Sequence, residues 1–251
     1  MFDRGLVSVS FRSIDPKRIM ELCNGAGLTF IEWGSDVHAV CTDIDRLEYI
    51  SSEQEKYGIR SSSYGTYFKI GRDRVECLNE YITAAKKLGC SILRIWCGEK
   101  NYTDMTEEER TLIISECTAA AKIAEESGVV LCCECHGGTF TNVPCGALRL
   151  MREVDSDHFL MYWQPNQHES TEYNLDYARS IAPYTKVIHV FNWKGNKKLP
   201  LSDAVEEWKR YLSVFDGSQK LLLEFMPDGS PDSLFAEAES LGRIVSEVCC
   251  E

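Results

Sequence analysis

The sequence predicts an α/β fold, a single closed (β/α)8 barrel spanning residues 1–251. Short apolar runs alternate with amphipathic stretches eight times and account for nearly every residue. This alternation is typical of a parallel sheet with helices packed outside it, because parallel neighbours need a crossover connection. Eight such units in 251 residues match the size of a closed barrel. No glycine-rich GxGxxG follows the first run, which argues against an open dinucleotide-binding sheet.

The first four units contain clear signals for the start and end of helices, whereas their strand patterns differ in strength. Asp15 is a predicted N-cap of the first helix, which ends at Gly25 or Gly27. Thr106 opens the fourth helix with Glu109 three residues later, the spacing of a capping box. The third strand has the weakest pattern. The predicted strands cover 5–11, 28–33, 59–68 and 91–98, and the helices 19–27, 44–58, 72–89 and 106–127.

The last four units repeat the same alternation of strand and helix patterns. Each apolar run ends in a polar residue and is followed by an amphipathic stretch. The predicted strands cover 129–136, 159–166, 186–193 and 220–226, and the helices 145–154, 171–184, 201–215 and 233–248. No linker-like or low-complexity segment divides the chain, so we expect one domain.

Composition narrows the classes of function. The net charge is -12, so a general nucleic-acid surface would work against the field of the whole molecule. No signal peptide precedes the first strand and no apolar run approaches the ~20 residues needed to span a membrane. We therefore expect a cytoplasmic protein with no membrane and no nucleic-acid partner. The oligomeric state stays open, a homo-oligomer included. The 12 cysteines lie largely inside strand and helix patterns, which favours reduced thiols.

Four predicted strands end in side chains suited to acid–base or metal chemistry. Glu134, Gln164, His189 and Glu224 each follow apolar residues on their own strand face. In (β/α)8 barrels the functional groups lie at the carboxyl ends of the strands. We therefore expect these four side chains to meet in one pocket.

Two carboxylates facing each other across a substrate can move a proton between faces of one carbon or between neighbouring carbons. Glu134 and Glu224 are the candidate acid–base pair. A divalent cation between them, completed by a neutral His189, would stabilise an enediolate oxygen. Gln164 is either a further ligand or a hydrogen-bond partner of a substrate hydroxyl. The alternative for the two glutamates is a pair of salt bridges at the barrel rim.

Other polar and aromatic residues near strand ends are candidate substrate-binding groups. His136 is followed by two glycines, which let a ligand approach the backbone. Arg94 shares a strand face with apolar residues and needs an anionic partner, such as Glu134 or a substrate group. Aromatic ring faces suit the C–H faces of a sugar. The candidates are Glu32, Asp36, His38, Arg94, Trp96, His136, His168 and Trp193.

These motifs resemble the xylose isomerase-like TIM barrels, a superfamily that includes sugar phosphate isomerases and epimerases, inosose dehydratases and AP endonucleases. The resemblance covers nearly the whole chain. Its specific parts are IEWGSDVH, CCECHGG, YWQPN, IHVFNW and LLLEFM. In metal-dependent members, strands five to eight give Glu, Asp, His and Glu to one divalent cation, and the two Glu residues also act as acid and base.

Carried over, the resemblance implies Glu134, His189 and Glu224 as metal ligands. Gln164 stands at the Asp position, and an amide oxygen is a weaker ligand than a carboxylate, so a metal site and a metal-free site both stay open. His136 is similar to the histidine of the ExH motif that many members carry, and His168 is a rough counterpart of the histidine after the Asp. AP endonuclease relatives use further His and Asp ligands for three zinc ions, and no full set is found here.

The sequence therefore predicts a sugar or sugar-derivative isomerase or epimerase that acts through an enediolate. The expected cofactor is a divalent metal, Mn, Mg, Co or Zn, and the expected partner is a small carbohydrate. Dehydration of a cyclic polyol in the same pocket is one alternative. A non-catalytic carbohydrate-binding barrel is the other.

Overall fold

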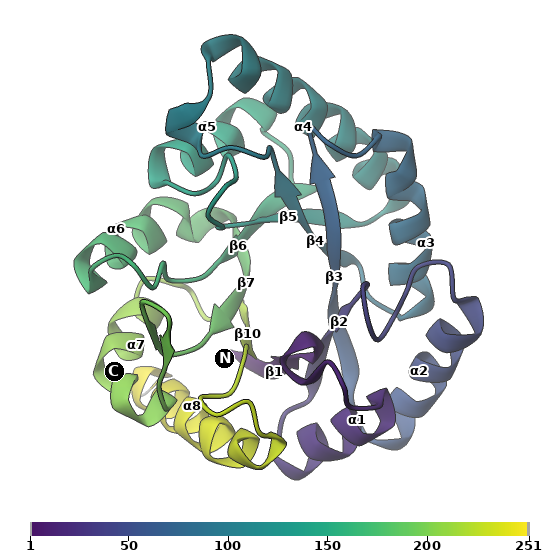
Figure 1. Ribbon diagram of the computed structural model, residues 1–251, viewed down its shortest axis with the longest axis vertical. Helices are drawn as coiled ribbons and strands as arrows, with labels where there is room; N and C mark the ends of the chain where they lie inside the picture. Colours follow the sequence, from purple (N-terminus) through teal and green to yellow (C-terminus); the bar gives the residue numbers. More distant parts are fainter. Residues whose placement is uncertain (1, 250–251) are drawn as a thin grey trace.

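Eight parallel strands close into a barrel, with helices around its outside (Figure 1). The computed structural model describes residues 2–249. Neighbouring strands follow the order β1-β10-β7-β6-β5-β4-β3-β2 around the ring. The (β/α)8 prediction is confirmed. The barrel strands are β1 (Asp3–Val7), β2 (Phe30–Gly34), β3 (Arg60–Ile70), β4 (Ile92–Cys97), β5 (Val130–Glu134), β6 (Phe159–Trp163), β7 (Thr185–Val190) and β10 (Lys220–Leu223).

A helix follows each barrel strand and packs against the outside of the sheet (Figure 1). A short antiparallel hairpin, β8 (Trp193–Lys194) with β9 (Lys197–Lys198), interrupts the connection after β7. The helices are α1 (Pro16–Gly25), α2 (Ile44–Lys56), α3 (Leu78–Lys87), α4 (Glu107–Ser127), α5 (Pro144–Val154), α6 (Thr171–Ile181), α7 (Val205–Leu212) and α8 (Leu234–Cys249).

The predicted helix starts are confirmed at atomic detail. The Asp15 carboxylate accepts the N–H of Lys17 at the start of α1. Thr106 and Glu109 form both hydrogen bonds of the capping box at the start of α4. Each bond satisfies an N–H group that has no partner within the helix.

All eight strands differ from their predicted bounds by one or more residues, and the differences at β1 and β3 affect the surroundings of the site. β1 ends at Val7, because the next four residues, predicted as strand, form a 3-10 turn over Ser8–Phe11. The buried Ser8 hydroxyl in that turn accepts the N–H of Gly34, which ties the turn to the end of β2. β3 is longer than predicted and runs to Ile70.

Apolar side chains fill the barrel interior on the amino-terminal side of the polar strand-end residues. Phe30, Cys132, Leu160, Val187 and Leu222 pack together inside the ring and are almost fully buried. Along the same strand faces the next inward residues are polar, because successive inward positions are two residues apart. Inside the barrel, the apolar layer therefore lies next to a polar layer, which is at the carboxyl ends of the strands.

None of the helices within residues 2–249 is long and apolar enough to cross a membrane.

Candidate active site

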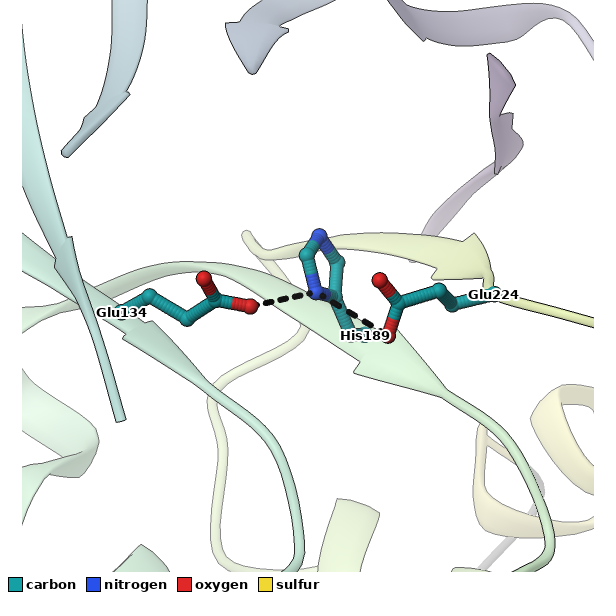
Figure 2. Close-up of side chains that lie close together, drawn as sticks. All are labelled: Glu134, His189 and Glu224. Carbon is teal, nitrogen blue, oxygen red and sulfur yellow. Dashed lines mark ion pairs between the residues drawn. The ribbon is translucent and has the colours of Figure 1, made fainter. Parts of the chain in front are cut away.

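One nitrogen of His189 faces oxygen atoms from three other strands or strand ends. Its Nδ1 lies 3.3 Å from Oε1 of Glu134 and 3.6 Å from Oε2 of Glu224. The two carboxylates approach the imidazole from opposite sides (Figure 2). Oε1 of Gln164 lies 3.3 Å from the same nitrogen. The four side chains expected to meet do meet.

The amide of Gln164 is held in one orientation. Its Nε2 donates to the backbone carbonyl of Cys135 at 3.0 Å, just after β5. The amide oxygen is thereby left to face His189. The backbone of Glu134 is also fixed, because the Thr141 hydroxyl donates to its carbonyl.

Arg94, on β4, forms a buried ion-pair network with two glutamates. Its Nη1 donates to Oε2 of Glu134 at 2.5 Å, and its Nε lies 3.1 Å from Oε1 of Glu32. The Trp96 indole N–H donates to the same Oε2 of Glu134. The expected anionic partner of Arg94 is therefore present. One oxygen of Glu134 is held by these donors and the other faces His189.

The surroundings shift the pKa values of the central groups in different directions. Burial raises the pKa of Glu134, but Arg94 together with His189 and His136 outweighs burial and holds that pKa well below its usual range. Burial raises the pKa of Glu224, and the nearby charge of Glu134 adds to the increase. Burial lowers the pKa of His189, but the carboxylates of Glu224 and Glu32 outweigh it and raise the pKa to about 10. Without a metal, His189 is therefore protonated at neutral pH, whereas the neutral His189 of the prediction belongs to the metal-bound site.

A cavity of about 430 Å³ opens above these groups. On one wall the His136 ring packs on Trp96, with centroids 5.0 Å apart. On another, Trp193 packs on Phe225, with centroids 5.5 Å apart. The predicted residues that line the cavity are Arg94, Trp96, Glu134, His136, Gln164, His168, Trp193 and Glu224.

Three candidate substrate-binding residues lie outside the cavity lining. Glu32 is fully buried, with its carboxylate against Arg94 and His189. The ring of His38 is buried and its two nitrogens contact the Ser8 hydroxyl and a backbone carbonyl. Asp36 pairs with Arg12. Glu32 and His38 are thus buried against internal partners, whereas Asp36 and Arg12 are both exposed, and a role of Asp36 in substrate binding stays a prediction.

The predicted site residues omit several residues of the cavity wall, among them two aromatic residues, Tyr67 and Phe225. Tyr67 lies within the predicted third strand and lines the cavity, but it was not singled out. The alternation of Ser63, Gly65 and Tyr67 on one strand face was the available signal. Phe225 follows Glu224 with a φ of 56°, a left-handed conformation that is uncommon for a bulky residue. No sequence pattern marked it.

The residues present fit a divalent cation. Ligand atoms of Glu134, His189 and Glu224 all lie within 4.8 Å of one another, and the amide oxygen of Gln164 faces the same place. Two carboxylates, an imidazole and an amide oxygen are ordinary donors for divalent metals. These residues could therefore hold one cation at the base of the cavity.

Residues 20–247 match the family model described as "Xylose isomerase-like TIM barrel". The chain belongs to the xylose isomerase-like TIM barrel family. The resemblance seen in the strand-end motifs is thereby confirmed. No curated protein matches the sequence.

Solved structures share the fold of this family member at low sequence identity. The probable 3-DHS dehydratase AsbF of Bacillus anthracis is 16% identical, with 96% of this chain and 99% of that chain covered and a TM-score of 0.80. D-psicose 3-epimerase of Clostridium cellulolyticum H10 is 12% identical, with 98% and 99% covered and a TM-score of 0.72. A xylose isomerase-like TIM barrel protein of Mycobacterium smegmatis in complex with magnesium is 14% identical, with 99% and 97% covered and a TM-score of 0.72. At these identities the likeness establishes the fold and leaves the reaction open.

Proposed function

We propose that this chain is a metal-dependent isomerase or epimerase of a sugar or sugar derivative. One observation carries the proposal. Carboxylates from β5 and from the end of β10 approach a single histidine nitrogen from opposite sides (Figure 2). Both carboxylates line a cavity that also has aromatic walls. The epimerase among the similar folds is consistent with this class of reaction.

Glu134, Gln164, His189 and Glu224 would hold the cation. A bound divalent cation stabilises negative charge that develops on substrate oxygen atoms. The two carboxylates have different surroundings and therefore different roles. Glu134 is held in its ionised form by Arg94 and by the Trp96 indole, which also fix its position.

Glu224 is the better group for removing a proton from a substrate carbon. Its pKa is raised by burial, and a base or acid works best when its pKa lies closer to the working pH. Its side chain also keeps 12% of its surface exposed, whereas that of Glu134 keeps 3%. In an epimerase, Oε1 of Glu134 would take up a proton from solvent and donate it to the opposite face, while Glu224 keeps the proton that it removed; in an isomerase, Glu224 would return its proton to the neighbouring carbon.

The cavity wall would bind the substrate. The rings of Trp96 and Trp193 offer apolar faces to carbon-bound hydrogens, and His136 and His168 offer polar atoms to hydroxyl groups. Arg94 also lines the cavity, but its guanidinium is engaged by two carboxylates. We assign it to Glu134 and not to the substrate.

Dehydration of a cyclic hydroxy-ketone is a second candidate. His136 supplies the observation that favours it, because its ring lies in the cavity on the Glu134 side and adds a third proton-transfer group. Such a group can protonate a hydroxyl that leaves after the carbon has lost its proton. A dehydratase is among the similar folds.

The test is exchange of solvent deuterium into a panel of aldoses, ketoses and cyclic polyol ketones with the Mn²⁺-loaded protein, followed by NMR and mass spectrometry. Deuterium at the carbon next to the carbonyl supports isomerase or epimerase chemistry. A product lighter by one water supports the dehydratase. Glu224→Gln should abolish either result.

Glu237→Gln is the matched control. Glu237 is also buried, but its carboxylate accepts the backbone N–H of Leu201 and lies outside the cavity lining. This variant should keep full exchange. Exchange that persists in Glu224→Gln would contradict the assigned base. Sugar binding without exchange in the wild type would favour a carbohydrate-binding barrel.

A further inference from the structure

The second nitrogen of His189 points away from the cavity, toward a carboxylate that no substrate reaches. Its Nε2 lies 3.4 Å from Oε2 of Glu32, and both side chains are fully buried. Glu32 comes from β2, across the barrel interior from β7. The imidazole therefore lies between Glu32 on one side and the proposed metal ligands on the other.

The Glu32 carboxylate is held in place by several donors. The Tyr162 hydroxyl donates to its Oε2 at 2.8 Å, and the Ser63 hydroxyl donates to the same oxygen at 3.2 Å. Nε of Arg94 lies 3.1 Å from its Oε1. A carboxylate with these partners has little freedom to rotate.

The neighbouring strand leaves room for that carboxylate. A Cβ added to Gly65 on β3 would lie 2.5 Å from Oε1 of Glu32. The φ of Gly65 is not positive, so the glycine is not required by backbone conformation. It is required by the space that the carboxylate occupies.

An imidazole nitrogen that carries a proton cannot bind a metal. A neutral histidine therefore binds through one nitrogen and keeps its proton on the other, and an acceptor near the second nitrogen selects this tautomer. We propose that Glu32 is a positioning residue that accepts the Nε2–H of His189 and so keeps Nδ1 directed at the metal position. The inference rests on the proposed metal-dependent function, and it concerns binding of the metal and not turnover.

Glu32→Gln is the direct perturbation. The glutamine keeps the size of the side chain, and Arg94 keeps Glu134 as a partner. The amide can donate to Nε2 and so favour the tautomer with the proton on Nδ1, which competes with the metal. Loss of a partner of this kind typically reduces metal affinity about 10–100-fold.

The first measurement is titration calorimetry with Mn²⁺ alone. We expect about one equivalent bound by the wild type, a Kd about 10–100-fold higher for Glu32→Gln, and an unchanged Kd for Glu237→Gln. Tyr162→Phe removes one donor to Glu32 without a change of charge. It should raise the Kd about two- to five-fold, which keeps the inference testable if Glu32→Gln folds poorly.

The second measurement reports the tautomer. The chain has 5 histidines, so long-range ¹H–¹⁵N spectra are simple, and the His189 signals are those missing from His189→Asn. With Zn²⁺ bound, the wild type should show a proton on Nε2 and metal on Nδ1. A merely structural role for Glu32 would leave this signature unchanged in Glu32→Gln.

The outcomes separate this inference from the proposed function. Unchanged Mn²⁺ affinity and an unchanged tautomer in Glu32→Gln would overturn the role of Glu32 and leave the metal site intact. A wild type that binds no divalent metal would overturn both. Weaker binding together with an altered tautomer, whether or not any sugar is turned over, supports the inference.

Discussion

Replacing Arg94 with methionine tests whether the buried charges under the cavity depend on one another. Arg94 lies between Glu32 and Glu134, with 5%, 0% and 3% of the respective side-chain surfaces exposed. Methionine fills similar volume but leaves two buried carboxylates without Arg94, their strongest cationic partner, and with only His189 nearby. Breaking a buried pair by removing one partner typically costs about 3–5 kcal/mol. We expect Arg94→Met to lower the free energy of unfolding by that amount at neutral pH.

Arg149→Met is the matched control. Arg149 also pairs with two glutamates, Glu107 and Glu153, but those side chains keep 59% and 46% of their surface exposed. Exposed pairs contribute at most about 1 kcal/mol, so this variant should lose little. The assay is urea denaturation of both variants and the wild type in EDTA, which removes any contribution of bound metal.

The way in which the stability difference between the wild type and Arg94→Met changes with pH provides a second test. In the wild type Arg94 holds the pKa of Glu134 below its usual range, so the ionised carboxylate contributes stability at pH values above about 4.5. That contribution is lost as the pH falls through the folded-state pKa. Without Arg94, burial is opposed only by His189 and His136, so the pKa of Glu134 should be higher than in the wild type. The difference in free energy of unfolding between the wild type and Arg94→Met should therefore become smaller as the pH falls toward about 4. A difference below about 1 kcal/mol at neutral pH, or a difference that grows on acidification, would refute the proposed dependence of the two carboxylates on Arg94.

Two further predictions concern the metal ligands. Burial lowers the pKa of His189, but Glu224 and Glu32 outweigh it and raise the pKa to about 10, against about 6.5 in an unfolded chain. The metal-free protein should therefore be stabilised by His189 below about pH 6.5 and lose that stability as the pH rises through about 10. Thermal melts in EDTA check this, and His189→Asn should lack the dependence. Gln164→Leu removes an amide oxygen and should bind Mn²⁺ at least about five-fold more weakly in calorimetry. An unchanged Kd would show that Gln164 is not a ligand.

Much of the fold and of the site centre followed from one periodicity. Alternation of side chains along a strand placed Glu134, Gln164, His189 and Glu224 on inward faces, and the carboxyl ends of parallel strands share one side of a barrel. Local sequence was enough for both steps. The capping residues of α1 and α4 were equally local signals.

The surroundings of that centre depend on contacts between distant strands, which local patterns do not encode. Glu32 faces inward as expected, but its depth is set by a register shift between β2 and β3 at Ile31/Glu32 and by the space beside Gly65. His38 was a candidate because it follows the second strand in a polar segment, but its ring contacts the Ser8 hydroxyl and the carbonyl of Ile14, which are distant in sequence. The protonation of His189 depends on carboxylates from three other strands or strand ends. None of these features can be read from a single segment.

The four proposed ligands all come from the second half of the barrel, and the last of them follows β10, the strand that closes the ring between β7 and β1. Glu224 is held there by a hydrogen bond from its N–H to the carbonyl of Val190. Its carboxylate reaches the other ligands only after β10 has joined the sheet. Binding of a cation would therefore be coupled to completion of the ring, and would stabilise the closed barrel by an amount that grows with the logarithm of metal concentration over Kd. A bound cation would link β10 to the strands that carry the other three proposed ligands.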